Sequence, residues 1–338
     1  YNDNLILWNL MGASALQLWH LEDAIFAFQK AINIEPNAAE AHNNMGNAFK
    51  TQGKVEEAIK AYQKALAINP NAAQPYNNTG NLLRDQGKLE QSIAAYNKAI
   101  TLKPDYAEAY INMGNALKEQ SKLEDAIEAY KKAITIKPDF AEAYNNMGVS
   151  LTNQGKLDDA IKAYNTALSI KPDSVEFLSN MGTALKGVTF NRPDKNLQKT
   201  INSILAKKKY VRPKEIAKAA ISLLKLEPTL QKHLQSVDDE VLENLLDVIS
   251  DINEFPLLLK LMSVCPLPDL DIENLFKKLR ASLLMSILHI TVPPQVLRFQ
   301  SALALQCFTN EYIYGHTEEE EKILKLLEAN IKKNFKNN

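Results

Sequence analysis

Glycine recurs along this chain at one fixed interval, and that interval constrains the fold more than any other feature. Six glycines stand 34 residues apart, namely Gly12, Gly46, Gly80, Gly114, Gly148 and Gly182. A fixed period of this length is typical of stacked supersecondary units, each of which buries its apolar face against the next. Of the 11 glycines in the 338 residues, only Gly315 lies beyond residue 187. The sequence therefore predicts a repeat array followed by a region of another kind.

Other side chains recur with the same period when the unit is numbered from Leu5. Position 24 holds Phe28, Tyr62, Tyr96, Tyr130 and Tyr164, position 27 is always Ala, and position 32 is always Pro in the first five units. This order of rings, small residues and Pro resembles the tetratricopeptide repeat. The resemblance implies an all-α fold with a right-handed superhelical solenoid, and helical spacing after the array predicts that a small helical domain follows it. It sets the full repeats at 5–38, 39–72, 73–106, 107–140 and 141–174, with a terminal helix at 175–187.

Each unit contains two stretches with apolar residues at helical spacing, such as 107–119 and 122–136 in the fourth unit. Gly at position 8 removes bulk where the paired helices approach each other. Gly at position 15 suits the turn between them, where Trp19 and Ser121 replace it in the first and fourth units. We interpret Asp105 with Glu108 as a capping box at the start of a first helix, because an acid and a Glu three residues later are typical of that motif.

The first helices are expected to line the concave face of the solenoid, and their polar positions are therefore candidate ligand contacts. Position 6 carries Asn44, Asn78, Asn112, Asn146 and Asn180; position 9 carries Asn47, Asn81 and Asn115; position 12 carries Lys50, Arg84 and Lys118. A carboxamide offers two donors and an acceptor, which suit an extended peptide backbone, and the cations suit acidic side chains. The same asparagines also fit a solvated face that was inherited when the unit was duplicated.

The Asn row resembles the asparagine ladder in the tetratricopeptide superhelix of O-linked N-acetylglucosamine transferases, which grips the backbone of substrates. The carboxylate-clamp type of repeat instead uses Lys at position 2, where this chain has Glu40, Gln74, Glu108, Glu142 and Glu176. We interpret those acids as residues that favour the start of a helix rather than as ligand contacts. The resemblance therefore implies backbone recognition more than capture of an acidic tail.

Residues 190–338 lack the period but still show helical spacing, so we set the domains at 1–189 for the array and 190–338 for an all-helical region. The segments 211–220 and 299–312 resemble the helical middle part of bacterial tetratricopeptide proteins that continue into an S-adenosylmethionine-dependent methyltransferase domain. That resemblance implies a covalently linked catalytic domain after residue 338. Within the chain no strand leads into a Gly-rich turn and helix, so no cofactor site is predicted.

Composition excludes several other classes of function. The chain has 39 Lys and Arg against 40 Asp and Glu, a net charge of −1 that argues against a nucleic-acid partner. Cys265 and Cys307 are too few for a disulfide framework or a four-thiolate zinc site, and the five His show no metal-ligand spacing. No span suits a membrane, and no leader is visible, so we expect a cytoplasmic location.

The sequence leads to one main hypothesis and two alternatives. The main hypothesis is a non-catalytic scaffold that grips an extended protein segment in its groove, without a metal or cofactor. In the first alternative the chain recruits substrates for a longer transferase, a methyltransferase before a glycosyltransferase. In the second, the exposed ends of the array stack between copies into an oligomer.

Overall fold

The computed structural model describes residues 4–207, 211–235 and 245–286, and the single residues 299, 302, 303, 322 and 325. Within these residues all regular structure is helical. The chain divides into two compact units, Tyr1–Pro172 and Asp173–Asn338. The first compact unit ends near the end of the fifth repeat. The single helix of the incomplete sixth repeat belongs to the second compact unit.

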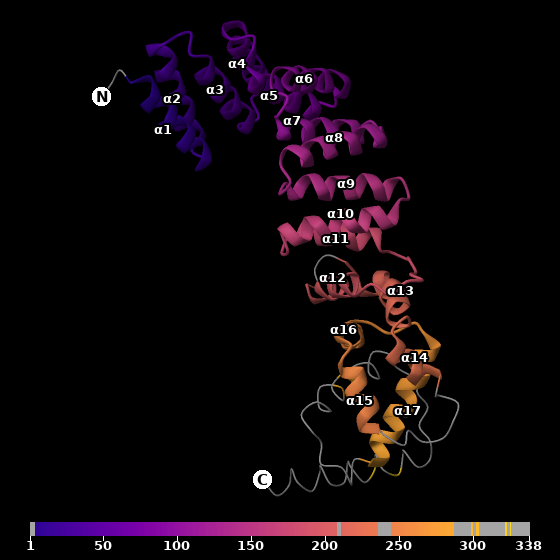
Figure 1. The fold of residues 1–338 in the computed structure, drawn as a ribbon. Coiled ribbons are helices and arrows are strands. Elements are labelled where there is room, and N and C mark those ends of the chain that lie inside the picture. The colour runs from indigo at the N-terminus through magenta and orange to yellow at the C-terminus, as the bar shows by residue number, and fades with distance from the viewer. Residues whose placement is uncertain are drawn as a thin grey trace, which may run out of the picture. The chain divides into compact units, whose positions relative to one another are not determined.

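The first unit is a stack of five helix pairs, shown in indigo to magenta in Figure 1. The first helices of the pairs are α1 (Leu5–Gln17), α3 (Ala39–Thr51), α5 (Ala73–Asp85), α7 (Ala107–Glu119) and α9 (Ala141–Asn153). The second helices are α2 (Leu21–Ile34), α4 (Val55–Ile68), α6 (Leu89–Leu102), α8 (Leu123–Ile136) and α10 (Leu157–Ile170). The helices expected at 107–119 and 122–136 are confirmed, and the Pro at position 32 follows the end of each second helix.

Glycine at position 8 allows the two helices of each pair to touch through a ring. A Cβ atom added to Gly46 would lie 2.5 Å from the ring of Tyr62, and one added to Gly114 would lie 2.6 Å from that of Tyr130. Real Cβ atoms do not approach carbon that closely, so a larger residue would push the ring out of its buried position. The structure thus confirms the packing role predicted for this position.

The turn between the helices of a pair has the left-handed backbone that glycine favours. Gly53, Gly87 and Gly155 have φ angles of 74 to 76°, and the two replacements, Trp19 and Ser121, adopt the same conformation with φ of 61 and 62°. For residues with a Cβ this conformation is strained. The repeat geometry therefore overrides the local preference of both residues.

The capping boxes were predicted wrongly. Helix α7 begins at Ala107, as predicted, but its N-cap is Tyr106 rather than Asp105, and helix α9 has Phe140 in the same place; neither makes a side-chain capping bond. Each ring instead packs under a cation, since the Lys103 Nζ lies 5.0 Å from the Tyr106 ring centroid and Lys137 stands similarly over Phe140. Packing at the junction between repeats thus decides the cap residue.

The second unit begins with α11 (Val175–Ala184), α12 (Lys195–Ala206) and α13 (Pro213–Leu224), and continues with α14 (Pro228–Gln235), α15 (Leu245–Asn253), α16 (Pro256–Val264) and α17 (Leu270–Ser286). Helical spacing in the sequence predicts helices at 212–226 and 256–264, which α13 and α16 confirm, whereas α12 and α14 were not predicted. Helical spacing also predicts helices at 295–314 and 318–335, of which the structure describes only residues 299, 302, 303, 322 and 325. Gly182 faces Val211 here, where earlier repeats supply a ring.

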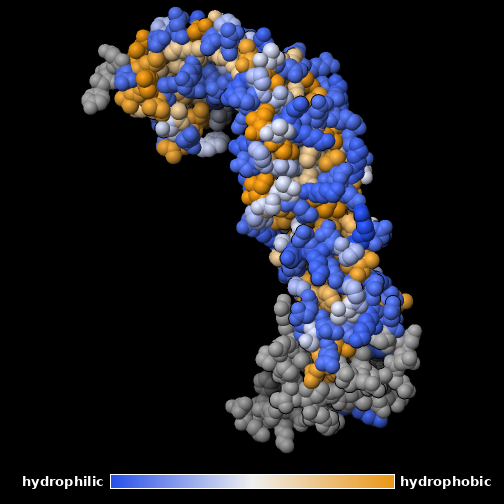
Figure 2. All heavy atoms as spheres, viewed as in Figure 1, coloured by the Kyte–Doolittle hydropathy of each residue, from blue (hydrophilic) through white to orange (hydrophobic). Residues whose placement is uncertain are grey.

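Apolar side chains gather on the surface of the first helix pair (Figure 2). Ile6, Leu10 and Trp19 are 60 to 74% exposed, and Ile6 and Leu10 stand where the later repeats have Glu or Gln and Asn. The other side of this helix pair is covered, because Ala31 and Ile32 of α2 share a buried cluster with Ala41 of α3. Among the described residues, no helix has both the length and the apolar composition needed to cross a bilayer.

Candidate functional site

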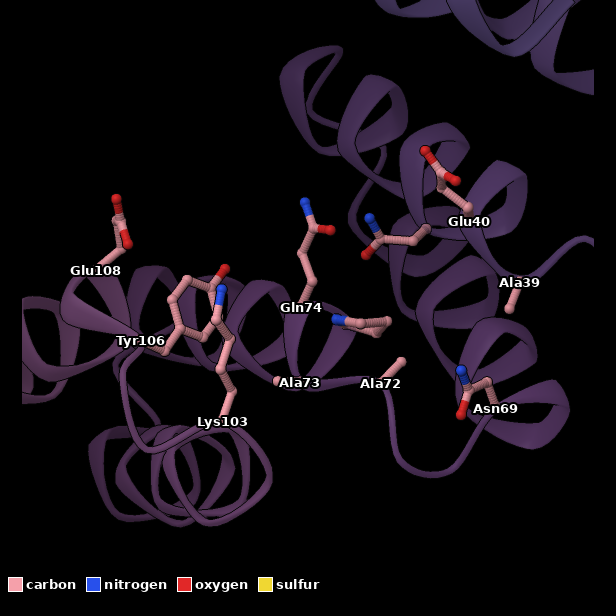
Figure 3. A pocket seen from close by; sticks show the side chains of 11 residues that line it. Ala39, Glu40, Asn69, Ala72, Ala73, Gln74, Lys103, Tyr106 and Glu108 are labelled. Carbon is pink, nitrogen blue, oxygen red and sulfur yellow. The ribbon is translucent and has the colours of Figure 1, made fainter. Parts of the chain in front are cut away.

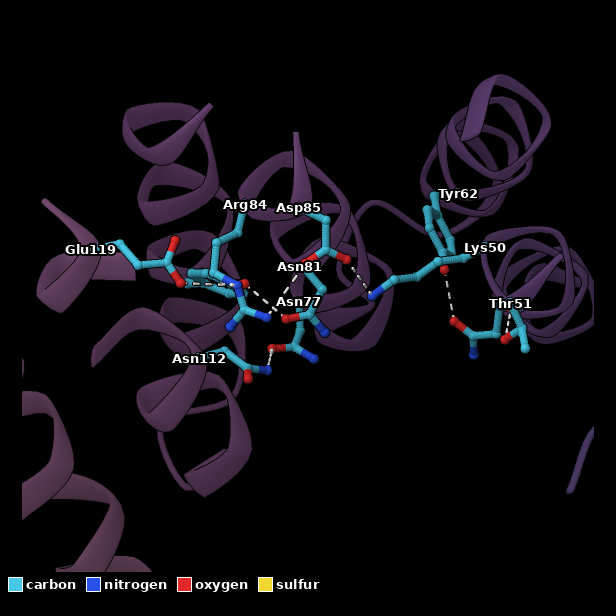
Figure 4. Close-up of polar contacts among 11 residues, drawn as sticks. Lys50, Thr51, Tyr62, Asn77, Asn81, Arg84, Asp85, Asn112 and Glu119 are labelled. Atoms are coloured by element: carbon cyan, nitrogen blue, oxygen red, sulfur yellow. Dashed lines mark hydrogen bonds and ion pairs between the residues drawn. The ribbon is translucent and has the colours of Figure 1, made fainter. Parts of the chain in front are cut away.

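The asparagines at position 9 hold the buried tyrosines of the same repeat. The hydroxyls of Tyr62, Tyr96 and Tyr130 donate to the Oδ1 atoms of Asn47, Asn81 and Asn115, each at 2.8 Å, and Figure 4 labels Tyr62 and Asn81 of this set. Burial of the rings raises the pKa of each of these tyrosines well above its usual value. In the fifth repeat Val149 replaces the asparagine, and Tyr164 lies 3.3 Å from the Thr152 hydroxyl instead. Three predicted ligand contacts thus have a structural role.

The asparagines at position 6 connect each repeat to the one before it. The Nδ2 atom donates to an Oδ1 atom at position 5 of the preceding repeat in three places: Asn44 to Asn9 at 3.2 Å, Asn78 to Asn43 at 2.9 Å, and Asn112 to Asn77 at 3.0 Å. These bonds join each pair of neighbouring first helices from α1 to α7, and we call the set the amide ladder.

One substitution changes the ladder in the fifth repeat. Position 5 of the fourth repeat is Ile111, which has no acceptor and is buried in the apolar core. The Nδ2 atom of Asn146 therefore donates to Asn115, at position 9, at 3.0 Å. The Oδ1 atom of Asn115 thus accepts from both Tyr130 and Asn146.

The four position-6 asparagines, Asn44, Asn78, Asn112 and Asn146, differ in whether the side-chain oxygen is still available to accept a hydrogen bond from a ligand. The Oδ1 atoms of Asn44 and Asn146 accept from the neighbouring Asn43 and Asn145 at 3.3 Å. For Asn78 and Asn112, no donor to Oδ1 occurs within residues 4–207. Both side chains are half-buried and reach solvent. The third and fourth repeats therefore offer the most backbone-binding capacity.

Sequence reasoning left out the asparagines at position 5. Asn43, Asn77 and Asn145 are 1 to 5% exposed, and the first two are the acceptors on which the ladder is built. Their 34-residue spacing was visible in the sequence, but only packing shows that position 5 is buried whereas position 6 reaches solvent. The remaining member of the predicted row, Asn180, lies on α11 in the second unit.

The cations at position 12 are paired with acids at position 13 of the next repeat. The Nζ atom of Lys50 lies 3.3 Å from the carboxylate of Asp85, and Arg84 lies 3.5 Å from Asp85 and 3.8 Å from Glu119 (Figure 4). These side chains stand at the carboxyl-terminal ends of α3, α5 and α7. Lys50 and Arg84 therefore have partners before any ligand arrives. Lys118 stands at the same position of α7.

The acids at position 2 lie in the first turn of the first helices, as expected for residues that favour a helix start. In the fifth repeat Lys171, at position 31, donates to the carboxylate of Glu142. Partial burial raises the pKa of Glu142, but the hydrogen bond and charge of Lys171 outweigh that effect, and the pKa lies below its usual value.

No group of three or more His, Cys, Asp or Glu side chains is arranged to hold a metal ion in the part of the chain that the structure describes. Cys265 is buried, which raises the pKa of its thiol to about 11. A thiol that is protonated at neutral pH is a poor nucleophile. Cys307 lies outside the described residues.

Comparison with known proteins agrees with the repeat pattern. Family models for the TPR repeat match residues 20–53, 80–121 and 114–155, and models for the tetratricopeptide repeat match 39–72, 141–174 and 61–94. Comparison with curated proteins gives no significant match.

Several solved structures are similar to part of this chain. PilF of Pseudomonas aeruginosa superposes with a TM-score of 0.53 at 22% identity, over 61% of this chain and 90% of PilF. MamA superposes with a TM-score of 0.43 at 27% identity, over 50% of this chain and 92% of MamA. YrrB, described as a TPR protein with an unusual peptide-binding site, superposes with a TM-score of 0.42 at 22% identity, over 52% of this chain and 91% of YrrB. The PilF likeness supports the superhelical fold, and the family models identify tetratricopeptide repeats within residues 20–174.

Proposed function

We propose that the tetratricopeptide repeats of this chain bind an extended segment of another protein along the first helices, and that they do so without catalysis. The observation that carries the proposal is the amide ladder, in which Asn78 and Asn112 each keep a carbonyl oxygen and one N–H for a partner. An extended backbone presents alternating N–H and C=O groups that such carboxamides can pair with. No observation favours the alternatives of a transferase arm or a self-assembling module.

The proposal assigns different roles to residues that looked equivalent in the sequence. Asn78 and Asn112 are the expected backbone contacts, and Asn44 and Asn146 contribute less because their oxygens are already used. Asn47, Asn81 and Asn115 hold the tyrosines in place and affect binding only through the fold. Recognition through backbone atoms predicts broad specificity among partners.

A peptide-display selection on the full chain tests the proposal. A random 12-residue library provides a binding peptide, whose affinity is then measured by calorimetry for the wild type and for the Asn78→Ala/Asn112→Ala double variant. Loss of two hydrogen bonds worth about 1 kcal/mol each predicts a roughly 30-fold weaker affinity. The matched control is Asn33→Ala/Asn97→Ala, which changes two asparagines on second helices.

Backbone recognition is tested separately with the peptide itself. N-methylation of single backbone amides removes donors without changing side chains, so methylation at the contacting positions is expected to weaken binding and methylation elsewhere to have little effect. Unchanged affinity for both the double variant and every methylated peptide would show that the ladder only joins the repeats.

A further inference from the structure

A hollow of about 690 Å³ opens at the amino-terminal ends of α3, α5 and α7, inside the first unit (Figure 3). Its lining includes Glu40, Gln74 and Glu108, which are the position-2 residues of three successive repeats. These three side chains extend from successive first helices beside the hollow, and Tyr106 lies between Gln74 and Glu108 in the view of Figure 3. The hollow therefore follows the direction in which the repeats stack.

The hollow includes a small residue at the junction between two repeats. Position 34 holds Tyr106 and Phe140 in the third and fourth repeats, and each ring lies beneath a lysine. In the second repeat the same position is Ala72, which lines the hollow. A methyl group thus stands at this junction in place of the ring found further along the array.

The carboxylates beside the hollow lack the counter-charge that the fifth repeat supplies. There, Lys171 at position 31 pairs with Glu142 at position 2 of the same repeat. In the second repeat position 31 is Asn69, which carries no charge, and Glu40 makes no ion pair within residues 4–207. Glu108 likewise has no ion pair there, because Lys137 lies over the Phe140 ring at 4.7 Å.

One ammonium group also lines the hollow, that of Lys103, and it is held over the ring of Tyr106. Two carboxylates against one cation leave the lining net negative. At the other end of the same helices the cations Lys50 and Arg84 are already paired with acids. The unneutralised charge of this groove is therefore acidic, and charge complementarity favours a basic partner.

We propose that the hollow receives Lys or Arg side chains of the bound segment, whose cationic groups pair with Glu40 or with Glu108, while Gln74 on the helix between them is a neutral acceptor. This proposal rests on the proposed function, because the ladder would hold the backbone while the hollow selects a side chain. It reverses the specificity expected from sequence, which assigned acidic ligand side chains to Lys50 and Arg84. The partner is thus an extended basic segment.

Three fluorescent 12-residue peptides test the proposal on the full chain. They alternate Ser with Lys, with Glu or with Gln, and their binding is followed by anisotropy at low and at physiological salt. We expect the Lys peptide to bind at least 10-fold more tightly than the Glu peptide, with the difference shrinking as salt screens the charges. Equal affinity for the Lys and Glu peptides, or preference for Glu, overturns the proposal.

Two variants locate the effect in the hollow. Glu40→Gln/Glu108→Gln is expected to weaken binding of the Lys peptide 3- to 10-fold, which corresponds to the loss of two ion pairs with exposed carboxylates. Asn69→Lys, which supplies Glu40 with the cation found in the fifth repeat, is expected to weaken it as well. The control Glu56→Gln/Glu90→Gln removes the same charge from exposed sites on α4 and α6 and is expected to change affinity less than 2-fold.

The outcomes separate this proposal from the proposed function. If the Lys peptide loses affinity for Asn78→Ala/Asn112→Ala but not for Glu40→Gln/Glu108→Gln or Asn69→Lys, the hollow does not select a basic side chain, although the groove still binds a segment. If the charge-matched control weakens binding as much as the hollow variant, only net charge matters and the proposal fails. If none of the three peptides binds and display selection also yields no peptide, both proposals fail.

Discussion

The hydrogen bond between Tyr96 and Asn81 gives a sharp test of how the first helices are held in place. Tyr96→Phe keeps the ring that packs on Gly80 and removes only the hydroxyl, which donates to the Asn81 Oδ1 atom at 2.8 Å. No other donor to that oxygen occurs within residues 4–207. The half-buried carbonyl of Asn81 therefore loses its partner, and the expected cost is about 1 to 2 kcal/mol of unfolding free energy.

Tyr130→Phe is the matched comparison, because its acceptor has a second donor. The Asn115 Oδ1 atom still accepts from Asn146 at 3.0 Å after the hydroxyl is lost. Ser150, which also neighbours the Tyr130 hydroxyl, keeps its own bond to the Asn146 carbonyl at 3.1 Å. No polar atom is left without a partner, so the expected cost is about 0.5 kcal/mol. Both variants remove a hydroxyl from a buried tyrosine ring. The expected difference of about 1 kcal/mol between their losses of unfolding free energy is therefore the cost of leaving the Asn81 carbonyl unpaired.

Urea unfolding of the full chain, followed by far-UV circular dichroism, measures both costs against the wild type. Because a repeat array does not always unfold in one step, amide hydrogen exchange of α5 and α7 provides a local measure. The double variant Tyr130→Phe/Asn146→Ala removes both donors to the Asn115 Oδ1 atom and leaves that oxygen unpaired. Its loss of unfolding free energy is therefore expected to reach that of Tyr96→Phe or exceed it. If Tyr130→Phe alone costs as much as Tyr96→Phe, the reasoning about shared acceptors is refuted.

Four further predictions concern packing, backbone and titration. Gly46→Ala should destabilise the chain by about 1 to 2 kcal/mol in thermal unfolding, because the added Cβ meets the Tyr62 ring at 2.5 Å and this outweighs the better helix propensity; an unchanged melting temperature would contradict the contact. Ser121→Gly should stabilise it by about 0.5 to 1 kcal/mol by relieving the φ of 62°, and a loss of stability would show that no strain is stored there. Cys265 should react with a thiol reagent at pH 8 only after unfolding, as mass spectrometry of its peptide can establish, since burial raises its pKa to about 11. Stability should fall as pH rises above about 10, because the unfolded tyrosines then lose protons that the folded ones, with raised pKa, retain; a flat stability between pH 9 and 11 would exclude this coupling.

The sequence predicted correctly those contacts that depend on the size of one residue at one repeat position. The ring at position 24 and the glycine at position 8 are complementary in size, so their shared period predicted the contact between Tyr62 and Gly46. It failed at Tyr106, because whether a residue caps a helix depends on what else competes for its place, and here the ring packs under Lys103. Helix α12 was missed because it begins at Lys195, four residues later than a second helix of the repeat would.

The candidate site was predicted only in outline. The period selected the asparagines at positions 6 and 9 as one class, but the structure separates them, since Asn81 holds Tyr96 whereas Asn78 keeps an unpaired carbonyl. The cations at position 12 looked available, and their pairing with Asp85 and Glu119 depends on the stagger between repeats. Pairings between units depend on three-dimensional register, which a list of repeated positions does not contain.

The sequence by itself determined the architecture of residues 5–174, because a 34-residue period of rings, small residues and Pro has few other ways to bury its apolar faces. Only the tertiary structure decided which repeated polar side chains are used up in joining the repeats and which keep bonding capacity or charge for a partner. The physical reason is that Asn and Glu bond over short distances, so a single change such as Ile111 or Asn69 alters the partners of its neighbours without altering the fold.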